Sequence, residues 1–347
     1  MPEETSPRSS SRRPLLLAGL GLLLVLAVIV AAVTLRGGGE DTPTAPSPAP
    51  TTAAPTPPPF PEAPASVSGH ARLTVPEEPR FAEGTFWARA GQEYLVTVDV
   101  TSEKPEGSGG NAMYLGVTLS CSPQAGGPGI TAGGTQNMLT GEETTYRNQG
   151  LVTVAEDGPV DCSIKLSAPY DDVASNGTTF DVDGTWRATV AGADAREAST
   201  DGLPRTVDPG PAQAVLSTEA PVEAGADLRA LTSLHLTTCT IVNGSREDGR
   251  AWCDEADLDE AGSTVQLTAT AQLLDASGEV CQKLDTATTK PDHIDEYRHH
   301  RLIPVELEIA VPQKPCGTTV RVNVAVTNDG PAPLVVHRSN SSLVVAA

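Results

Sequence analysis

Residues 146–168 read YRNQGLVTVAEDGPVDCSIKLSA, and residues 297–325 read YRHHRLIPVELEIAVPQKPCGTTVRVNVA. Each stretch contains Tyr-Arg, then Leu, an alternating run, a turn with Pro, a Cys and a second alternating run. Alternation of apolar and polar residues, rich in Val, Ile and Thr, is typical of half-buried β-strands, because successive side chains point to opposite faces of a sheet. The two stretches therefore predict one strand–turn–strand unit in each half of the chain, as in a diverged tandem repeat.

Further short alternating runs occur on both sides of these two stretches. They are YLVTVDV (94–100), YLGVTLSC (114–121), TWRATVAG (185–192), LHLTTCTIV (234–242), TVQLTATAQLL (264–274) and SLVVAA (342–347). Gly, Asn, Asp and Pro separate the runs, and no amphipathic helix of useful length is present. The pattern predicts an all-β fold of two tandem antiparallel β-sandwiches, immunoglobulin-like or jelly-roll. We expect the first at 66–195, a linker at 196–213 and the second at 214–347.

The six cysteines are even in number and contain no C-x-x-C pair, which gives no support to a zinc or redox motif. In an oxidising compartment they predict three disulfides. The repeat pairs the first two cysteines with each other and the last two with each other. The expected disulfides are Cys121–Cys162, Cys239–Cys253 and Cys281–Cys316. In the chain-entropy model such loops contribute roughly 3–4 kcal/mol each.

The N-terminal region predicts a membrane anchor. Residues 15–35 carry no charge and are long enough to span a bilayer as a helix. Three Arg precede the run and one follows it, so residues 1–14 are expected in the cytoplasm and the C-terminus outside the cell. The alternative is a cleaved Sec or Tat export signal, because SRRPLL (11–16) resembles a twin-arginine motif. The apolar run is longer than that of a typical signal peptide, which favours the single-pass cell-membrane protein.

Residues 36–65 contain ten prolines among Ala, Thr and Gly, and predict a disordered linker rich in polyproline II. Residues 1–36 contain four Arg and two Glu, so the rest of the chain is more negative than the total of -21. A surface this acidic repels nucleic acid. The expected partners are therefore the membrane, through residues 15–35, and the cell wall or another surface protein.

The segment DHIDEYRHHR (292–301) is the strongest candidate for a metal site, because His and carboxylate side chains both bind metals. On a helix, His293, Glu296 and His300 would share one face. However, Pro291 and Pro304 bracket the segment, its arginines oppose a cation, and it is not HExxH. The pattern favours a solvated polar loop. An envelope metal-dependent enzyme that uses this loop is the alternative hypothesis.

No catalytic motif was found, so the chain is expected to be no enzyme and to need no cofactor. Trp252 stands beside a cysteine in an acidic segment and is the candidate for an exposed binding residue. Calcium sites were considered at FDVDGTW (180–186) and CDEADLDEAG (253–262), but neither follows the EF-hand spacing. Solvated turns are the simpler interpretation. A binding or structural role is the function that remains.

The architecture resembles the membrane-anchored extracellular β-sandwich proteins of high-GC Gram-positive bacteria. The resembling features are the Arg-flanked anchor, the Ala/Pro/Thr spacer and the acidic β-domains with disulfides. The resemblance spans the chain and implies a cell-surface protein, but it carries over no functional residue. The domains also resemble immunoglobulin-like sandwiches loosely, and depart from them because no Trp lies between Cys121 and Cys162 or between Cys281 and Cys316.

Overall fold

The computed structural model describes residues 60–106, 112–168, 177–238, 262–295 and 297–347. All described residues lie in one compact unit of the chain. No helix in these described ranges is long and apolar enough to cross a membrane. The expected membrane span at 15–35 lies outside the described residues.

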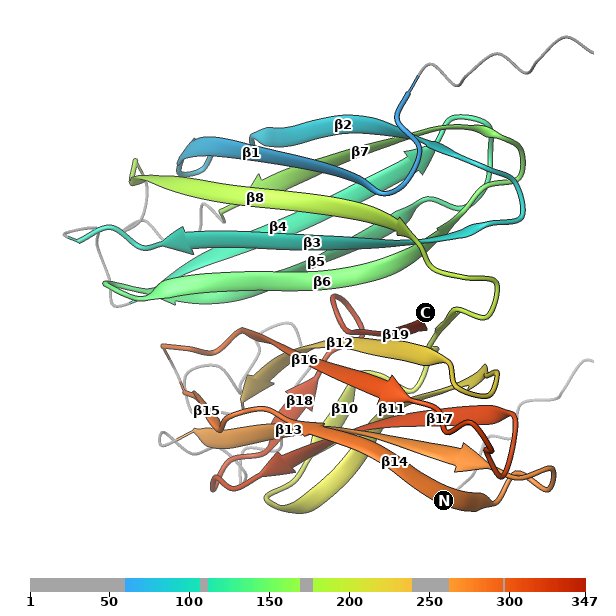
Figure 1. The fold of residues 1–347 in the computed structure, drawn as a ribbon. Coiled ribbons are helices and arrows are strands. Elements are labelled where there is room, and N and C mark those ends of the chain that lie inside the picture. The colour runs from blue at the N-terminus through green and yellow to red at the C-terminus, as the bar shows by residue number, and fades with distance from the viewer. Residues whose placement is uncertain (1–59, 107–111, 169–176, 239–261, 296) are drawn as a thin grey trace, which may run out of the picture. The chain divides into compact units, whose positions relative to one another are not determined.

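The first β-sandwich contains two four-stranded antiparallel sheets, drawn from blue to green in Figure 1. One sheet has the order β1-β8-β3-β6, with bounds Ala65–Thr74, Thr179–Val190, Glu93–Glu103 and Glu143–Thr153. The other has the order β2-β7-β4-β5, with bounds Arg80–Ala88, Gly158–Ser167, Ala112–Pro123 and Ile130–Leu139.

The second β-sandwich is built from the yellow-to-red strands of Figure 1. Its first sheet contains β9 (Arg196–Glu197), β19 (Ser342–Ala346), β12 (Asp227–Thr238) and β16 (Arg301–Ala310), with β10 (Arg205–Val207) and β18 (Leu334–Val336) extending it beside β12. Its second sheet contains β11 (Gly210–Pro221), β17 (Thr319–Asn328), β13 (Ser263–Leu274) and β14 (Val280–Thr288), with β15 (Asp292–Ile294) also paired to β13.

The two sandwiches share one topology. The order β9-β19-β12-β16 repeats β1-β8-β3-β6, and β11-β17-β13-β14 repeats β2-β7-β4-β5. Two four-stranded sheets between which the chain crosses in this order form a jelly roll. The structure therefore confirms the tandem antiparallel β-sandwiches and selects the jelly-roll topology over the immunoglobulin-like one.

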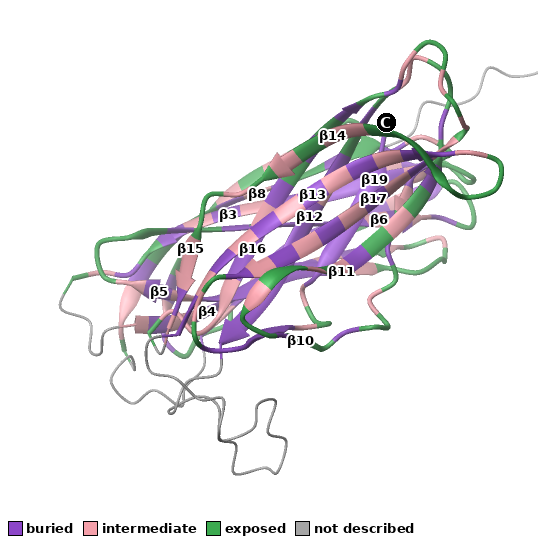
Figure 2. Cartoon of the chain, turned by 90° about the horizontal axis from the view of Figure 1, so that it is seen from below, coloured by how far each residue is buried: buried purple, intermediate pink, exposed green. Residues whose placement is uncertain are grey.

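Alternation of side chains builds each core. Strand β17 alternates intermediate and buried residues along its whole length, and β13 does so nearly as regularly (Figure 2). The inward residues of β13 and β17 are Val, Leu and Ala, with the polar Ser263 and Asn328 at one end, and the apolar ones meet the inward residues of β12 and β16. Burial of this apolar surface is the main source of stability for a sandwich.

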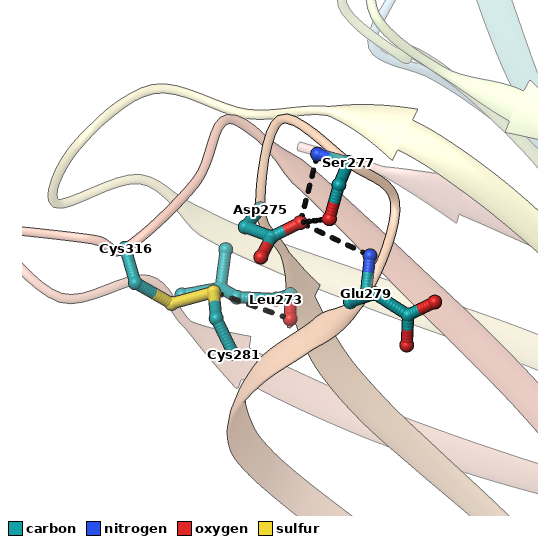
Figure 3. Close-up of a disulfide and its surroundings, with 6 residues drawn as sticks. All are labelled: Leu273, Asp275, Ser277, Glu279, Cys281 and Cys316. Atoms are coloured by element: carbon teal, nitrogen blue, oxygen red, sulfur yellow. Dashed lines mark hydrogen bonds between the residues drawn. A yellow bond between two sulfur atoms is a disulfide. The ribbon is translucent and has the colours of Figure 1, made fainter.

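Two expected disulfides are present. Cys121 and Cys162 are buried register partners on the adjacent strands β4 and β7. Cys281 on β14 is bonded to Cys316 in the connection that precedes β17, and Figure 3 shows this bond beside the β13–β14 turn. The two bonds join different strands of the common topology, so they are not equivalent by position. Cys239 and Cys253 lie outside the described residues.

Several boundaries differ from the sequence prediction. The segment 196–213, expected as a linker, contains β9, β10 and the first residues of β11, so it belongs to the second sandwich. The expected Tyr-Arg correspondence is also wrong, because Tyr146 is buried within β6 while Tyr297 is exposed ahead of β16. Pro304 lies inside β16, where an edge strand tolerates a residue that lacks an N–H donor.

Candidate functional site at the junction of the sandwiches

The two sandwiches meet along β12 and β19, which are buried on both faces. One face of these strands contributes Leu234 and Leu343 to the second core. The opposite face carries Leu231 and Val344, which pack with residues of the first sandwich that include Leu95. Because side chains alternate along a strand, a strand with two apolar faces is one that is covered on both sides. We call this contact region the junction.

Hydrogen bonds across the junction join β6 and β5 to the second sandwich. The side-chain amide of Gln149 donates to the carbonyl of Leu231 at 3.0 Å. The hydroxyl of Ser233 donates to the carbonyl of Arg147 at 2.5 Å. These bonds satisfy polar groups that the contact removes from water, and each contributes about 1 kcal/mol net.

A cleft of about 770 Å³ opens at the junction and is lined by both sandwiches. The first sandwich contributes residues 130–132 of β5 and 148–150 of β6. The second contributes Glu197, Ala198, Thr200, Pro204 and the segment 337–342. Cavities of this size accommodate a small organic molecule or a short segment of a polymer.

The side-chain amide of Asn148 holds one wall of the cleft in place through hydrogen bonds. Asn148 donates to the carbonyl of Gly133 and to that of Asn340, the latter at 2.9 Å. Its Oδ1 atom accepts from Ser342 Oγ at 2.5 Å and from the backbone N–H of Gln149 at 2.8 Å. All four hydrogen-bonding positions of the amide are thereby used. Asn148 holds the segment 337–342 against β6 and is a positioning residue.

Other polar groups of the cleft remain open to a ligand. The side chains of Thr131, Thr200 and Ser339 have no hydrogen-bond partner among the described residues, and neither has the side-chain amide of Asn340. Glu197 contributes a carboxylate, and desolvation raises its pKa while the backbone N–H of Leu151 partly offsets the shift. The cleft therefore presents neutral donors and acceptors with one carboxyl group and, at its rim, Arg338.

Four of the six histidines of the chain gather at the junction beside the cleft: His235, His299, His300 and His337. The rings of His235 and His337 lie 4.8 Å apart, and those of His235 and His300 lie 5.3 Å apart in a stacked arrangement. His300 also meets the ring of Tyr114 from the first sandwich edge-on at 5.1 Å. The histidine cluster thus connects the cleft, through His337, to strand β4 of the first sandwich.

The hydrogen bonds of the cluster accommodate neutral rings. Nδ1 of His235 lies 3.2 Å from the carbonyl of Ser339, and because a carbonyl only accepts, Nδ1 carries the proton. Nε2 of a neutral His235 then accepts from Nδ1 of His300 at 3.1 Å. Protonation of His235 at Nε2 would require His300 to carry its own proton on Nε2, so that its Nδ1 atom could accept.

Burial opposes protonation of the cluster as well. Desolvation, with smaller contributions from the neighbouring histidines, lowers the pKa of His235 to about 3, of His299 to about 4 and of His300 to about 3. Nδ1 of His299 is buried without a hydrogen-bond partner in the described part of the chain. A neutral imidazole tolerates this position far better than an imidazolium.

The segment 292–301 is therefore not the solvated loop expected. Residues 292–294 form β15, and His299 and His300 are partly buried in the junction. The backbone of His300 makes two hydrogen bonds with Asn137 of the first sandwich, at 2.6 and 3.0 Å. The prediction of a solvated loop was wrong because the contact between the two sandwiches removes these residues from water.

The structure does not assemble the candidate metal site. His293 lies 3.8 Å from Asp295, whereas His300 faces His235. Within the described ranges, no three His, Cys, Asp or Glu side chains are arranged to hold a metal ion. Glu296 lies outside the described residues, as does the binding candidate Trp252.

The first calcium candidate is not a turn. Residues 180–186 lie in the middle of β8, where the exposed Asp181 and Asp183 flank His70 of β1 at 3.4 and 3.1 Å. The two carboxylates are thus neighbours of a histidine side chain on the exposed face of a sheet. The second candidate, 253–262, lies outside the described residues except for Gly262.

Sequence reasoning missed His235 and His337, and it missed the cleft. His235 stands between Leu234 and Leu236 in a run that alternates as a strand, and alternation alone gives it no functional signal. The available signal was composition, because a chain with only six histidines places two of them side by side. The junction itself has no local signature, since it joins residues that lie far apart in the sequence, such as Asn148 and Asn340.

No family model and no curated protein matches the chain. Among solved structures, the N-terminal CBM22-1–CBM22-2 tandem domain of Paenibacillus barcinonensis Xyn10C is 10% identical, with 82% of this chain and 97% of that chain covered and a TM-score of 0.23. The infectious bursal disease virus Gt strain structure is 13% identical, with 81% and 70% covered and a TM-score of 0.27. The VP2 subviral particle of that virus is 13% identical, with 81% and 71% covered and a TM-score of 0.22.

The strand order defines this chain as a tandem jelly-roll β-sandwich protein. Superpositions with these low TM-scores add nothing to that assignment, which depends on the topology alone. The site that the two sandwiches form together is a polar cleft next to a buried histidine cluster.

Proposed function

We propose that this chain is a single-pass, membrane-anchored cell-surface protein whose two β-sandwiches bind a hydroxyl-rich ligand, such as a glycan segment, in the junction cleft. The observation that supports the proposal is the set of polar side chains in the cleft that have no partner among the described residues. Hydroxyl and amide groups can each donate and accept, which suits the many hydroxyls of a sugar.

The composition of the cleft favours this ligand over an apolar one. No Phe, Tyr or Trp lines it among the residues that the structure describes, and its largest aliphatic side chain is Ile130. A ligand would therefore be held by hydrogen bonds to Thr131, Thr200 and Asn340 and not by an aromatic platform. Glu197 would accept from a ligand hydroxyl, and charge-assisted hydrogen bonds of this kind are among the stronger ones.

A glycan array with the full-length protein in detergent tests the binding. We expect Glu197→Gln and Thr200→Val each to weaken binding about tenfold, because each removes a hydrogen bond to the ligand. Glu279→Gln is the matched control, since Glu279 is exposed near the β13–β14 turn far from the cleft lining. Equal binding by the wild-type, Glu197→Gln and Thr200→Val proteins would reject the cleft as the site.

The cell-surface location is tested on intact cells. The anchor at 15–35, with the N-terminus in the cytoplasm, predicts that external protease removes residues C-terminal to the linker at 36–65. It also predicts that the N-terminal peptide stays in the membrane fraction with its first residues intact. A mature N-terminus in or just after residues 30–40 would instead establish the secreted alternative. The envelope metal enzyme would require stoichiometric metal that is lost in His300→Ala.

A further inference from the structure

A second hollow at the junction, of about 340 Å³, is lined by three arginines. Arg147 belongs to β6, Arg187 to β8 and Arg229 to β12, so both sandwiches contribute to it. We call it the arginine groove. It lies on the outer face of the sheet β1-β8-β3-β6, and Gln149 lines both this groove and the cleft.

The register of the sheet places complementary side chains in a row. Thr97 on β3 is the partner of Gln149 on β6 and also of Arg187 on β8. Directly opposite residues in antiparallel strands lie on the same face with their Cβ atoms about 5 Å apart. A guanidinium, a hydroxyl and an amide therefore follow one another across the floor of the groove.

Two of the arginines are only partly used by carboxylates. Nε and Nη2 of Arg147 both donate to the same oxygen of Asp99, at 3.2 and 2.8 Å. Arg229 donates in the same way to one oxygen of Glu306. Because a guanidinium has five N–H donors, each arginine keeps its Nη1 donors for another acceptor.

Arg187 is the more available member of the set. It is exposed, and it has no carboxylate or hydrogen-bond acceptor in contact among the described residues. The groove contains three guanidinium groups against two carboxylates, although acids outnumber bases 44 to 23 in the whole chain. An unpaired guanidinium in a hollow with free donors on both sides is the arrangement that recognises planar or tetrahedral oxyanions.

We propose that the arginine groove binds an oxyanion group of a ligand, a carboxylate or a phosphate, with Arg187 as the primary contact. Arg147 and Arg229 complete the contact through Nη1, and Thr97 contacts the polar atoms beside the anionic group. This site is separate from the cleft in its lining, apart from Gln149, and does not depend on glycan binding there.

The test is a titration of the full-length protein in detergent with inorganic phosphate and, separately, with glucuronate, followed by NMR of the arginine Nε–H signals. We expect saturable shifts at Arg187, Arg147 and Arg229 with at least one of the two probes. Arg187→Gln should weaken binding about tenfold or more, because it removes a charged donor pair. Arg187→Lys should bind the probe with an affinity between those of the wild-type protein and Arg187→Gln, since lysine keeps the positive charge but lacks the planar pair of N–H donors.

Arg72→Gln is the matched control, because Arg72 is exposed on the same sheet face but does not line the groove. Thermal unfolding of each variant shows that the fold is kept. Binding of phosphate but not of glucuronate would point to a phosphate polymer as the ligand. Binding of glucuronate but not of phosphate would point to an acidic glycan. No saturation with either probe, or an equal loss in Arg72→Gln, would overturn the proposal. Loss of glycan binding in the Glu197→Gln cleft variant with retained phosphate binding would separate the two sites.

Discussion

The two sandwiches have one strand order but fill their cores with different side chains. The first core contains an aromatic group in which Phe86 lies 5.4 Å from Tyr94 and 6.3 Å from Trp186. The second core, as far as the structure describes it, consists of Ala, Val, Leu and Ile. The jelly-roll topology therefore does not depend on one kind of core, and alternation along the strands is the feature that both halves share.

The difference follows from what covers each sheet. In the second sandwich β12 and β19 are apolar on both faces because the first sandwich covers one of them. In the first sandwich β1 and β8 are solvated on their outer face. Their apolar burial therefore comes from the inner face, which has larger side chains such as Trp186. The second sandwich also holds all four histidines of the cluster, whereas the histidine described in the first sandwich, His70, is exposed. We therefore expect acid to destabilise the second sandwich more, and a cavity in the core to destabilise the first sandwich more.

The largest expected effect is that of pH on the second sandwich. The folded pKa values of His235, His299 and His300 lie below the ordinary 6.5, so the unfolded chain binds more protons than the folded one. Stability is then complete above pH 6.5 and falls as the pH decreases toward about 4, by about 1.4 kcal/mol per pH unit for each histidine that stays neutral. Urea unfolding at pH 7 and pH 5 should differ by several kcal/mol.

The comparison becomes sharper with two variants. His235→Gln should reduce the slope of stability against pH, because one buried titrating ring is removed. Leu234→Ala is the control, because it destabilises the same sandwich without removing a titratable ring, and it should lower stability equally at pH 7 and pH 5. If His235→Gln leaves the slope as steep as in the wild-type protein, acid sensitivity does not reside in the histidine cluster.

The next effect is a cavity in the aromatic core. Trp186→Ala should lower the free energy of unfolding by about 3–5 kcal/mol, since the side chain is fully buried and its Nε1–H donates to the carbonyl of Ala82. Leu234→Ala in the aliphatic core is the counterpart, and we expect about 2–4 kcal/mol there. Denaturant unfolding followed by far-UV circular dichroism measures both. A loss well below about 3 kcal/mol in Trp186→Ala would mean that the aromatic group does not set the stability of the first half.

The sequence allowed the strongly alternating strands to be predicted, because their pattern is local. Strands β3, β4, β7, β13 and β17 were all expected at these positions. Strand β5 was missed, since its buried residues include Gly133, Gly134 and Gln136. Gly134 occupies a point of close approach, where a Cβ atom would lie 2.2 Å from Leu302 Cδ2 of the other sandwich.

The junction could not be predicted either, because it depends on contacts between segments that are distant in the sequence. Its residues are ordinary in their own strands, and their environment is decided by a sheet that is distant in sequence. His300 illustrates this, because a histidine between two arginines suggests solvent until Tyr114 and Asn137 are seen to cover it. Two of the three expected disulfides, Cys121–Cys162 and Cys281–Cys316, are present as predicted, although the strands that they join are not equivalent. Local pattern thus predicted the fold, and only the contact between domains revealed the site.

A third effect distinguishes the two disulfides. Their sequence separations are 41 and 35, so the chain-entropy model assigns about 4 kcal/mol to each. Cys121 and Cys162 are buried, whereas Cys281 and Cys316 are exposed. A mild reductant should therefore open Cys281–Cys316 first, with a loss of about 2–4 kcal/mol, while the bond of the first sandwich persists. Alkylation of free thiols followed by peptide mapping gives the order, and simultaneous reduction of both bonds would contradict it.

The smallest effect concerns the ion pair between Arg298 of the second sandwich and Glu142 of the first, with 27% and 50% of the side chains exposed. A pair this exposed contributes about 0.2–1 kcal/mol, and salt screens it. Arg298→Gln should therefore lower stability only slightly at low ionic strength and not at all at high salt, as measured by thermal unfolding. Arg321→Gln, which breaks the pair with Glu219 inside the second sandwich, is the matched control. A loss in Arg298→Gln well above that of the control would mean that charge across the junction, and not the apolar contacts and buried hydrogen bonds of β12 and β19, holds the two unlike halves together.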